Sequence, residues 1–270
     1  MDLRIEQTIL VMATRFREPL SLAELAAGVG LSPFHFHRIF KAETRETPAA
    51  YLARIRLDHA AHLMVVLPDA PLLQIAFESG FSSAAVFARS FRLRYQQTAT
   101  EFRQSKKLLV SDIALPYALS LHRLPARKLS VERCPLDEDA LCAAHRRLQQ
   151  RSGARRSAAL GIFVDAPFHQ DRSTCRHYVA LEDDPCPDPD RAFLLPGGLY
   201  ARLRITGDID ALSRGILRFK SAQLDPSPYG IASTLAFERI EFPGNGELFD
   251  YRRSERDVFI KVRRKHEPVI

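Results

Sequence analysis

The sequence contains no tryptophan, and its four cysteines include no pair in CxxC spacing. This absence argues against a zinc ribbon and against a redox dithiol, so we expect free thiols in a reducing compartment. No uncharged apolar run approaches the roughly 18 residues that crossing a bilayer requires. The opening MDLRIEQTILVMATRF carries charges within its apolar run and predicts an amphipathic helix instead of a signal peptide. We therefore expect a cytoplasmic protein without a membrane partner.

A large excess of one charge is also missing, because 39 Lys+Arg stand against 32 Asp+Glu for a net charge of +7. Any basic surface must therefore come from the arrangement of side chains. The 270 residues, 46% of them hydrophobic, predict about two globular domains. The composition changes after residue 107, where apolar residues begin to alternate with polar ones and proline becomes more frequent. We expect a first domain at 1–107, a linker at 108–112 and a second domain at 113–270.

The first hundred residues contain an internal repeat. LAELAAGVGLS at 22–32 is matched at an offset of 50 by LLQIAFESGFS at 72–82, and an offset of 51 continues the match. Each copy has the apolar spacing of a helix, then a turn glycine, then a serine cap before a second helix. Pro33 suits the first position of the second helix. The stretch 47–66 has no Pro or Gly after its first turn and predicts one long helix joining the copies.

Each second helix has an outer stripe at i, i+3, i+4 and i+7. In the first copy it is Phe34, His37, Arg38 and Lys41, and in the second Ala85, Ala88, Arg89 and Arg92. A helix-turn-helix places its second helix in the major groove, where arginine can bind guanine and apolar side chains can touch thymine methyls. A charged stripe alone is also typical of a solvated helix face. The repeat and the turn glycines favour DNA binding.

Residues 1–107 resemble the AraC/XylS-type regulator domains, in which a long helix joins two helix-turn-helix units. The residues that carry the resemblance are LAELAAGVGLSPFHFHRIFK, TPAAYLARIRL, IAFESGFSS, FARSFRLRY and TATEFR. In that family both recognition helices enter successive major-groove segments on one DNA face. We expect base contacts from Phe34, His37, Arg38, Ala85 and Arg89, and phosphate contacts from Ser32, Lys41, Ser82, Ser83, Arg92 and Arg94. The first unit should specify more bases, because Ala84 and Ala85 stand where the family usually has polar residues.

Three clusters suggest metal sites only weakly. The pair His35 and His37 lies on nearly opposite sides of a helix, and the pair His59 and His62 has no third ligand nearby in the sequence. EDDPCPDPDR, at 182–191, lacks the glycine and the terminal glutamate of an EF-hand loop and predicts a solvated loop. We expect neither a metal nor a cofactor.

The second half has strand-like alternation, most clearly at 199–205, where apolar residues occupy every second position. KLSVERC, ALGIFVDA, HYVALE, LAFERIEF and RDVFIKV also predict strands, while LDEDALCAAHRRLQQR and DIDALSRGILRFKSAQL predict helices. Their order suggests a second, weaker duplication into two β-α-β-β units, giving an α+β domain. Two sheets or one curved sheet would leave a groove between the repeats, a common place for a ligand.

Within LAFERIEF, alternation places Glu238 on the same strand face as Ala236, Ile240 and Phe242. A desolvated carboxylate is unfavourable unless it is paired or protonated. Two interpretations are open at this point. Glu238 forms a salt bridge to an arginine of the domain, or it waits for a cationic ligand whose binding aromatic walls would strengthen.

Residues from about 112 to 270 resemble a GyrI-like effector-binding domain of the SHS2 type. The resemblance lies in LPARKLSVE, ALEDDPCPDPD, LPGGLYARLRITGDID, LAFERIEF and DVFIKVR. Such domains bind organic, often cationic or amphipathic molecules, and the glutamate of the phrase corresponding to LAFER commonly faces the ligand. The resemblance therefore implies an effector site at Glu238. Candidate walls are Phe163, Phe168, Tyr178, Phe193, Tyr200 and Tyr229.

These features predict a DNA-binding transcription regulator with the Rob-type order of domains, and not an enzyme. The expected partners are double-stranded promoter DNA, a small-molecule effector and RNA polymerase, with the chain a monomer or weak dimer. Two alternatives remain for the second domain. It could be a small-molecule hydrolase that uses Glu238 as a general base, or a protein-interaction module without a ligand.

Overall fold

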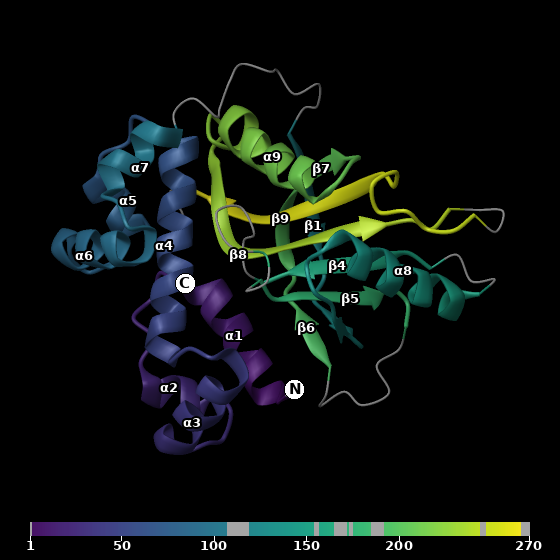
Figure 1. Ribbon diagram of the computed structural model, residues 1–270, viewed down its shortest axis with the longest axis horizontal. Coiled ribbons are helices and arrows are strands. Elements are labelled where there is room, and N and C mark those ends of the chain that lie inside the picture. Colours follow the sequence, from purple (N-terminus) through teal and green to yellow (C-terminus); the bar gives the residue numbers. More distant parts are fainter. Residues whose placement is uncertain are drawn as a thin grey trace. The chain divides into compact units, whose positions relative to one another are not determined.

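The computed structural model describes residues 2–106, 119–153, 157–164, 172, 175–184, 192–243 and 247–265. The chain divides into two compact units, Met1–Ala114 and Leu115–Ile270. The first unit is helical, and the second contains an antiparallel sheet with helices (Figure 1). The predicted linker at 108–112 lies outside the described residues. No described helix combines the length and the apolar character that crossing a membrane demands.

The helical unit consists of two helix pairs joined by a long helix. It begins with α1 (Leu3–Arg15) and ends with α7 (Ala99–Lys106). The pairs are α2 (Leu22–Ala27) with α3 (Pro33–Thr44), and α5 (Leu72–Glu78) with α6 (Ala84–Tyr95). The joining helix is α4 (Pro48–Val66), as the sequence predicts, and Figure 1 shows it running from one pair to the other.

Side-chain caps determine where the main helices begin. Ser32, Thr47 and Ser83 each accept a hydrogen bond from the backbone amide three residues further on. Pro33 follows its cap at the first helical position, where the missing N–H would have no partner in the helix. The N-termini of α3, α4 and α6 are therefore set by local sequence.

Both helix pairs have the same aromatic core. In the first pair the ring of Phe40 lies 5.5 Å from Phe36 and 5.4 Å from Tyr51. Fifty-one residues further on, Phe91 lies 5.5 Å from Phe87 and 5.4 Å from Phe102. All of these rings are buried. The repeat read from the sequence is thus a repeat of packing as well.

The turn of the second pair requires a glycine for two reasons. Gly80 has φ +85°, a conformation that side chains disfavour. A Cβ at this position would also lie 2.8 Å from the Cα of Arg17 and 2.8 Å from the carbonyl oxygen of Phe16. Gly30 in the first pair shares the positive φ, at +67°, but has open space around it.

The second unit is built on one large sheet. Its strands are β1 (Ser120–Leu124), β2 (Arg127–Leu129), β3 (Glu132–Arg133), β4 (Ala159–Phe163), β5 (His177–Leu181), β6 (Phe193–Leu195), β7 (Gly198–Ile205), β8 (Tyr229–Ile240) and β9 (Arg256–Arg264). Seven of them form an antiparallel sheet in the order β1-β7-β9-β8-β4-β5-β3, and β2 pairs with β6. The helices are α8 (Glu138–Ser152) and α9 (Ile209–Phe219), which continues into the π-helical turn η4 (Lys220–Leu224).

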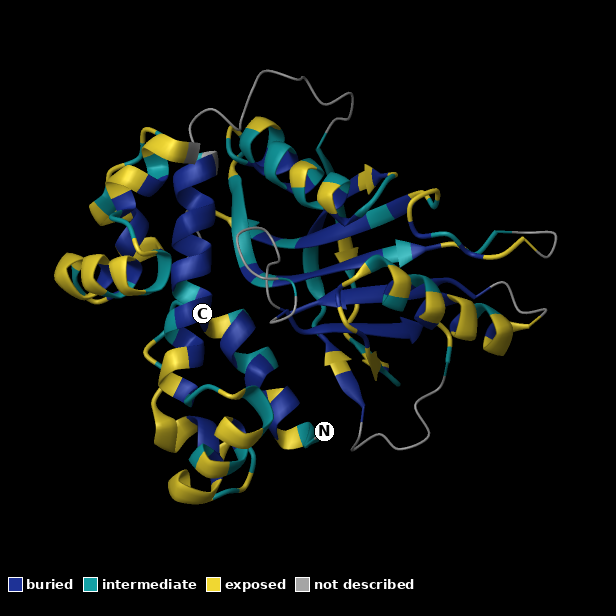
Figure 2. Ribbon diagram, viewed as in Figure 1, coloured by how far each residue is buried: buried dark blue, intermediate teal, exposed yellow. Residues whose placement is uncertain are grey.

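Both α8 and α9 pack on the same face of the sheet. Their apolar residues share one buried cluster with every second residue of β4, β5, β7, β8 and β9. The alternation predicted at 199–205 is confirmed, because Ala201, Leu203 and Ile205 belong to this cluster. Figure 2 shows the central strands as mostly buried. We call this side of the sheet the helix face.

One strand prediction is wrong. KLSVERC was expected as a single strand, but the chain leaves one sheet for the other within it. Its beginning lies in β2, which pairs with β6, and its later part lies in β3, which pairs with β5. Alternation marks extended backbone, but it does not say which neighbour the backbone pairs with.

Candidate nucleic-acid interface and effector site

The first recognition helix, α3, presents the predicted stripe to solvent. Phe34 is 82% exposed, and Arg38 and Lys41 are exposed as well, while His37 is half-buried. The cap residue Ser32 is exposed beside them. Phe36 and Phe40 point the other way, into the core. The helix therefore has an aromatic and basic outer side above an aromatic inner side.

The second recognition helix, α6, also presents its stripe. Ala85, Ala88, Arg89 and Arg92 are exposed, and most of α6 is drawn as exposed in Figure 2. Ser83 caps the helix through the amide of Val86, and Ser82 before it is exposed. A capped N-terminus with free amides and an exposed stripe is suited to DNA.

Arg94 is placed differently from the prediction. Its Nε donates to Oδ1 of Asp58 on α4 at 3.2 Å, and only 27% of the side chain is exposed. The hydroxyl of Tyr95 donates to the same oxygen at 2.8 Å. The guanidinium of Arg94 therefore holds α6 against α4 in this structure, and its phosphate contact stays a prediction.

Two exposed apolar residues of α6 were missed by the sequence reading. Val86 is 52% exposed and Leu93 is 76% exposed. They lie at i and i+7, so they share one side of the helix next to Arg89. Hydrophobic periodicity assigns apolar residues to the core by default. Because Phe87 and Phe91 mark the buried side of α6, the side with Val86 and Leu93 must face outward.

In the second unit, Glu238 is completely buried on the helix face of β8. The hydroxyl of Tyr251 donates to its carboxylate, at 3.0 Å from both oxygens. Nε of Arg256 lies 3.4 Å from Oε2. Burial raises the pKa of the Glu238 carboxyl to about 7, against the lowering influence of Arg256 and Tyr251.

Arg256 does not depend on the carboxylate alone. Its guanidinium donates to the backbone carbonyls of Tyr251 at 2.5 Å and Gly207 at 2.7 Å. It also lies 3.9 Å from the ring centre of Tyr251. Glu238 is therefore paired in this structure, and its role toward a cationic ligand stays a prediction. The other interpretation, a salt bridge to an arginine of the domain, describes the geometry.

Gly161, His145 and His177 complete the surroundings of Glu238. A Cβ on Gly161 would lie 2.6 Å from Oε1 of Glu238 and 3.0 Å from Nε2 of His177. Neither ring nitrogen of His177 has a hydrogen-bond partner in the part of the chain that the structure describes. Burial lowers the pKa of His177 to about 3 and that of His145 to about 4, so both rings are neutral near pH 7.

The expected walls of an effector pocket do not meet around Glu238. Phe163 lies on the helix face, packed at 4.7 Å against His177, and Tyr229 packs on the edge of the same cluster. Strand register puts Tyr178 and Tyr200 on the opposite face, and Phe193 packs at 5.4 Å against Tyr178. Phe168 lies outside the described residues. The candidate walls therefore lie on both faces of the sheet, because their strand positions have opposite parity.

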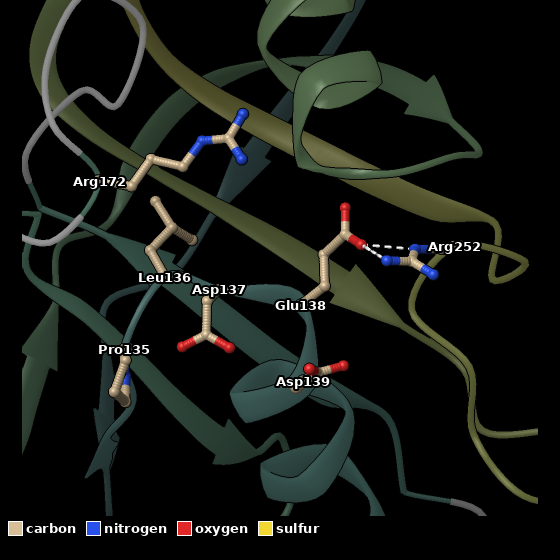
Figure 3. Close-up of a pocket in the computed structure, with 7 residues that line it drawn as sticks. All are labelled: Pro135, Leu136, Asp137, Glu138, Asp139, Arg172 and Arg252. Carbon is tan, nitrogen blue, oxygen red and sulfur yellow. Dashed lines mark hydrogen bonds and ion pairs between the residues drawn. The ribbon is translucent and has the colours of Figure 1, made fainter.

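A cavity of about 500 Å³ lies near the start of α8, and Figure 3 draws the residues that line it. Glu138 is paired across it with Arg252, the neighbour of Tyr251. Arg172 is paired with Asp210 of α9. The carboxylates of Asp137 and Asp139 complete a lining with more acidic than basic groups, and Leu136 adds an apolar surface. The sequence reading did not single out these residues.

The histidine pairs do not form metal sites in the described structure. Nε2 of the buried His59 lies 3.1 Å from NH2 of Arg17, and His62 is buried in the same helix. Among the described residues, no group of three or more His, Cys, Asp or Glu side chains could hold a metal ion. The acidic loop at 182–191 lies largely outside the described residues.

A family model described as a helix-turn-helix domain matches residues 25–105 of the chain. The matched stretch contains α3, α4, α5 and α6 entirely. It therefore includes both recognition helices and the helix that joins their units.

The chain is similar to curated regulators over part of its length. It is 31% identical to the Right origin-binding protein of Escherichia coli strain K12 over 133 residues, 49% of this chain and 46% of that protein. It is 31% identical to the transcriptional activator RhaS of Klebsiella pneumoniae over 109 residues, 40% of this chain and 39% of that protein. The chain thus spans less than half the length of these relatives.

A solved structure matches to a similar extent. A transcriptional regulator with an AraC-type DNA-binding domain from Chromobacterium violaceum is 28% identical, with a TM-score of 0.36. The match covers 38% of this chain and 91% of that one. With its repeated helix pairs and the matched family model, the helical unit is a helix-turn-helix domain.

Proposed function

We propose that this protein is a sequence-specific transcription regulator that binds promoter DNA through α3 and α6 and responds to a small effector through its second unit. One observation carries the DNA-binding part. The same helix pair occurs twice, each with a serine-capped second helix whose outer stripe is exposed and contains arginine. A pair of reading helices on one chain is suited to two successive segments of major groove.

Within each stripe the residues have different roles. Arg38 and Arg89 are the hydrogen-bonding readers of guanine, while Phe34, His37 and Ala85 touch neighbouring base edges. Lys41 and Arg92 lie one turn further on and bind phosphate, together with the helix N-termini at Ser32, Ser82 and Ser83. Arg94, which pairs with Asp58 through Nε, is the expected phosphate contact with the least exposed guanidinium of this group.

Arg38→Ala tests this assignment, with Lys41→Ala as the matched control on the same helix. Arg38→Ala should weaken binding to a selected operator by about 1–3 kcal/mol and relax the preference at one position. Lys41→Ala should weaken all sequences alike and reduce the salt slope by about one. An unchanged ratio of operator to scrambled DNA in the Arg38 variant would remove Arg38 from the base contacts.

For the second unit we propose that it binds a small cationic or amphipathic effector near Glu238. Two observations support this proposal. The cavity at the start of α8 is lined by three acidic and two basic side chains with an apolar surface, and Arg252 in that lining is adjacent to Tyr251, which bonds Glu238. The pKa of the buried Glu238 carboxyl is also raised to about 7, as is common at functional sites. The order β-α-β-β in each half, and a strand order symmetric about the β8–β4 pair, support a GyrI-like duplicated fold.

Titration calorimetry of the full chain with tetraphenylphosphonium tests the effector site. Glu238→Gln should weaken binding at least tenfold, whereas Glu247→Gln, an exposed carboxylate of the same unit, should leave it unchanged. Mass spectrometry should recover the ligand unaltered, because the proposal is sensing and not hydrolysis. Equal affinity of both variants would place the effector elsewhere. Contact with RNA polymerase, a cytoplasmic location and a monomeric or weakly dimeric state belong to the same proposal.

A further inference from the structure

The outer side of α6 is unusually apolar for a helix that meets DNA. Ala84, Ala85, Val86, Ala88 and Leu93 are all exposed around the part of α6 that is not buried; Val86 and Leu93, which share one side of it, are 52% and 76% exposed. At the positions equivalent to these two, 51 residues earlier, α3 has His35 and Ala42. The second helix has therefore replaced a polar side chain in its first turn with a branched apolar one.

Val86 stands where a recognition helix reaches bases. It belongs to the first turn of α6, since its backbone amide donates to the cap Ser83 at 3.3 Å. The early residues of the second helix are the ones that contact base edges. Val86 is at i−3 and Ala85 at i−4 from Arg89, so both flank that guanidinium on the helix surface.

Only one major-groove feature can be read by a side chain without hydrogen-bonding groups, and that is the C5-methyl group of thymine. Valine suits such a contact because its χ1 angle is nearly fixed in a helix, so little rotamer freedom remains to be lost. Arg89 supplies positive charge and two hydrogen bonds for a guanine beside it. None of the hydrogen bonds or ion pairs among the described residues involves the Arg89 side chain, which leaves it available to DNA.

We infer that Val86, with Ala85, makes α6 a reader of thymine methyl groups on either side of a guanine bound by Arg89. This inference rests on the proposed DNA binding and names the readout chemistry of its second half. The pair α5 and α6 then specifies its part of the operator by shape and methyl contact, with one hydrogen-bonding reader. The pair α2 and α3 uses Phe34, His37 and Arg38 for the same task.

The test uses the full chain and an operator selected from random DNA, in which single thymines are replaced by uracil. Uracil differs from thymine only by the lost methyl. In the wild type, each contacted thymine replaced under α6 should weaken binding about fourfold, the value of one buried methyl. Val86→Ala should weaken binding to the thymine operator by a similar factor and should no longer respond to uracil at that position.

Leu93→Ala is the matched control. Leu93 is more exposed than Val86 but lies seven residues further, about 10 Å along the helix axis. This variant should retain the full response to uracil, and both variants should retain the wild-type circular dichroism. Equal binding of thymine and uracil operators by the wild type, or an undiminished uracil response in Val86→Ala, would overturn the inference. Failure to select any sequence would instead refute the proposed DNA binding itself.

Discussion

Replacing Glu238 by glutamine tests whether the buried carboxylate raises or lowers the free energy of unfolding of the protein. Its pKa is raised from 4.5 to about 7 because burial removes the carboxylate from water. A raised folded pKa contributes stability that is fully present below the unfolded pKa and is lost as pH rises through 7. Two and a half pH units at 1.36 kcal/mol each correspond to about 3 kcal/mol. Above pH 7, the free energy of unfolding of the wild type is therefore about 3 kcal/mol lower than it would be with a neutral side chain at this position.

Glutamine has the shape of the protonated acid and does not titrate. Its oxygen can accept from the Tyr251 hydroxyl, and its amide can donate toward the unpaired Nε2 of His177 across Gly161. Arg256 keeps the carbonyls of Tyr251 and Gly207, so its guanidinium is not left without partners. We expect Glu238→Gln to be more stable than the wild type by about 3 kcal/mol at pH 8, and by about 1 kcal/mol at pH 5.5.

Hydrogen exchange read by mass spectrometry is the suitable assay, because peptides from 229–240 report the second unit within the full chain. Urea titration followed by circular dichroism gives an independent value, since the chain has no tryptophan to follow. The competing expectation is that removing one partner of a buried ion pair destabilises by about 3–5 kcal/mol. A variant less stable than the wild type at pH 8 would refute our reasoning and make the Glu238–Arg256 pair a structural support.

Three further predictions follow from the packing and the titrating groups. Gly80→Ala should destabilise the helical unit by about 2–4 kcal/mol, because a Cβ there meets backbone atoms at 2.8 Å. Gly30→Ala, which has open space around it, should destabilise the unit by about 1–2 kcal/mol for the positive φ alone. Equal losses of the two variants in thermal melts would contradict the steric argument. Asp58→Asn should cost about 1–3 kcal/mol in urea titrations, because it removes the charged acceptor shared by Arg94 and Tyr95; a neutral effect would show that these bonds do not hold α6. In the Glu238→Gln background, stability should fall as pH drops below 6.5, because the folded pKa values of His145 and His177 are lowered to about 4 and 3 and the unfolded chain binds the protons; a stability profile that is flat from pH 7 to 5 would rule out two buried neutral histidines.

The helical unit could be read almost entirely from the sequence, because its signals are local. Serine and threonine caps, turn glycines and the phenylalanine spacing act within a few residues, and each recurs at an offset of 50 or 51. The exception is Arg94, whose partner Asp58 is 36 residues away on another helix. Sequence periodicity places a residue on a helix side but does not say which charge lies opposite.

In the second unit, the sequence predicts which residues of one strand share a face of the sheet, but it does not predict which strands are neighbours. Period-two alternation placed Glu238 correctly among Ala236 and Ile240, because alternation is a property of one strand. Its partners Tyr251 and Arg256 come from beyond β8: strand register places Arg256 opposite Ile240, and Tyr251 lies in the turn before β9. The aromatic residues of β5 and β7 were assigned to one pocket because register, and with it the sheet face, is invisible in a single strand.

Hydrogen bonds that link side chains of α4 to the segment after α1 and to α6 make the joining helix a spacer of fixed length. Arg56 of α4 donates to the carbonyls of Phe16 and Glu18, and Asp58 accepts from Arg94 and Tyr95 of α6. Its 19 residues correspond to about 28 Å, slightly less than the 34 Å pitch of B-DNA. In the proposed DNA complex, such a rigid spacer would fix the phasing of the two major-groove segments, so each inserted base pair would rotate one segment out of register.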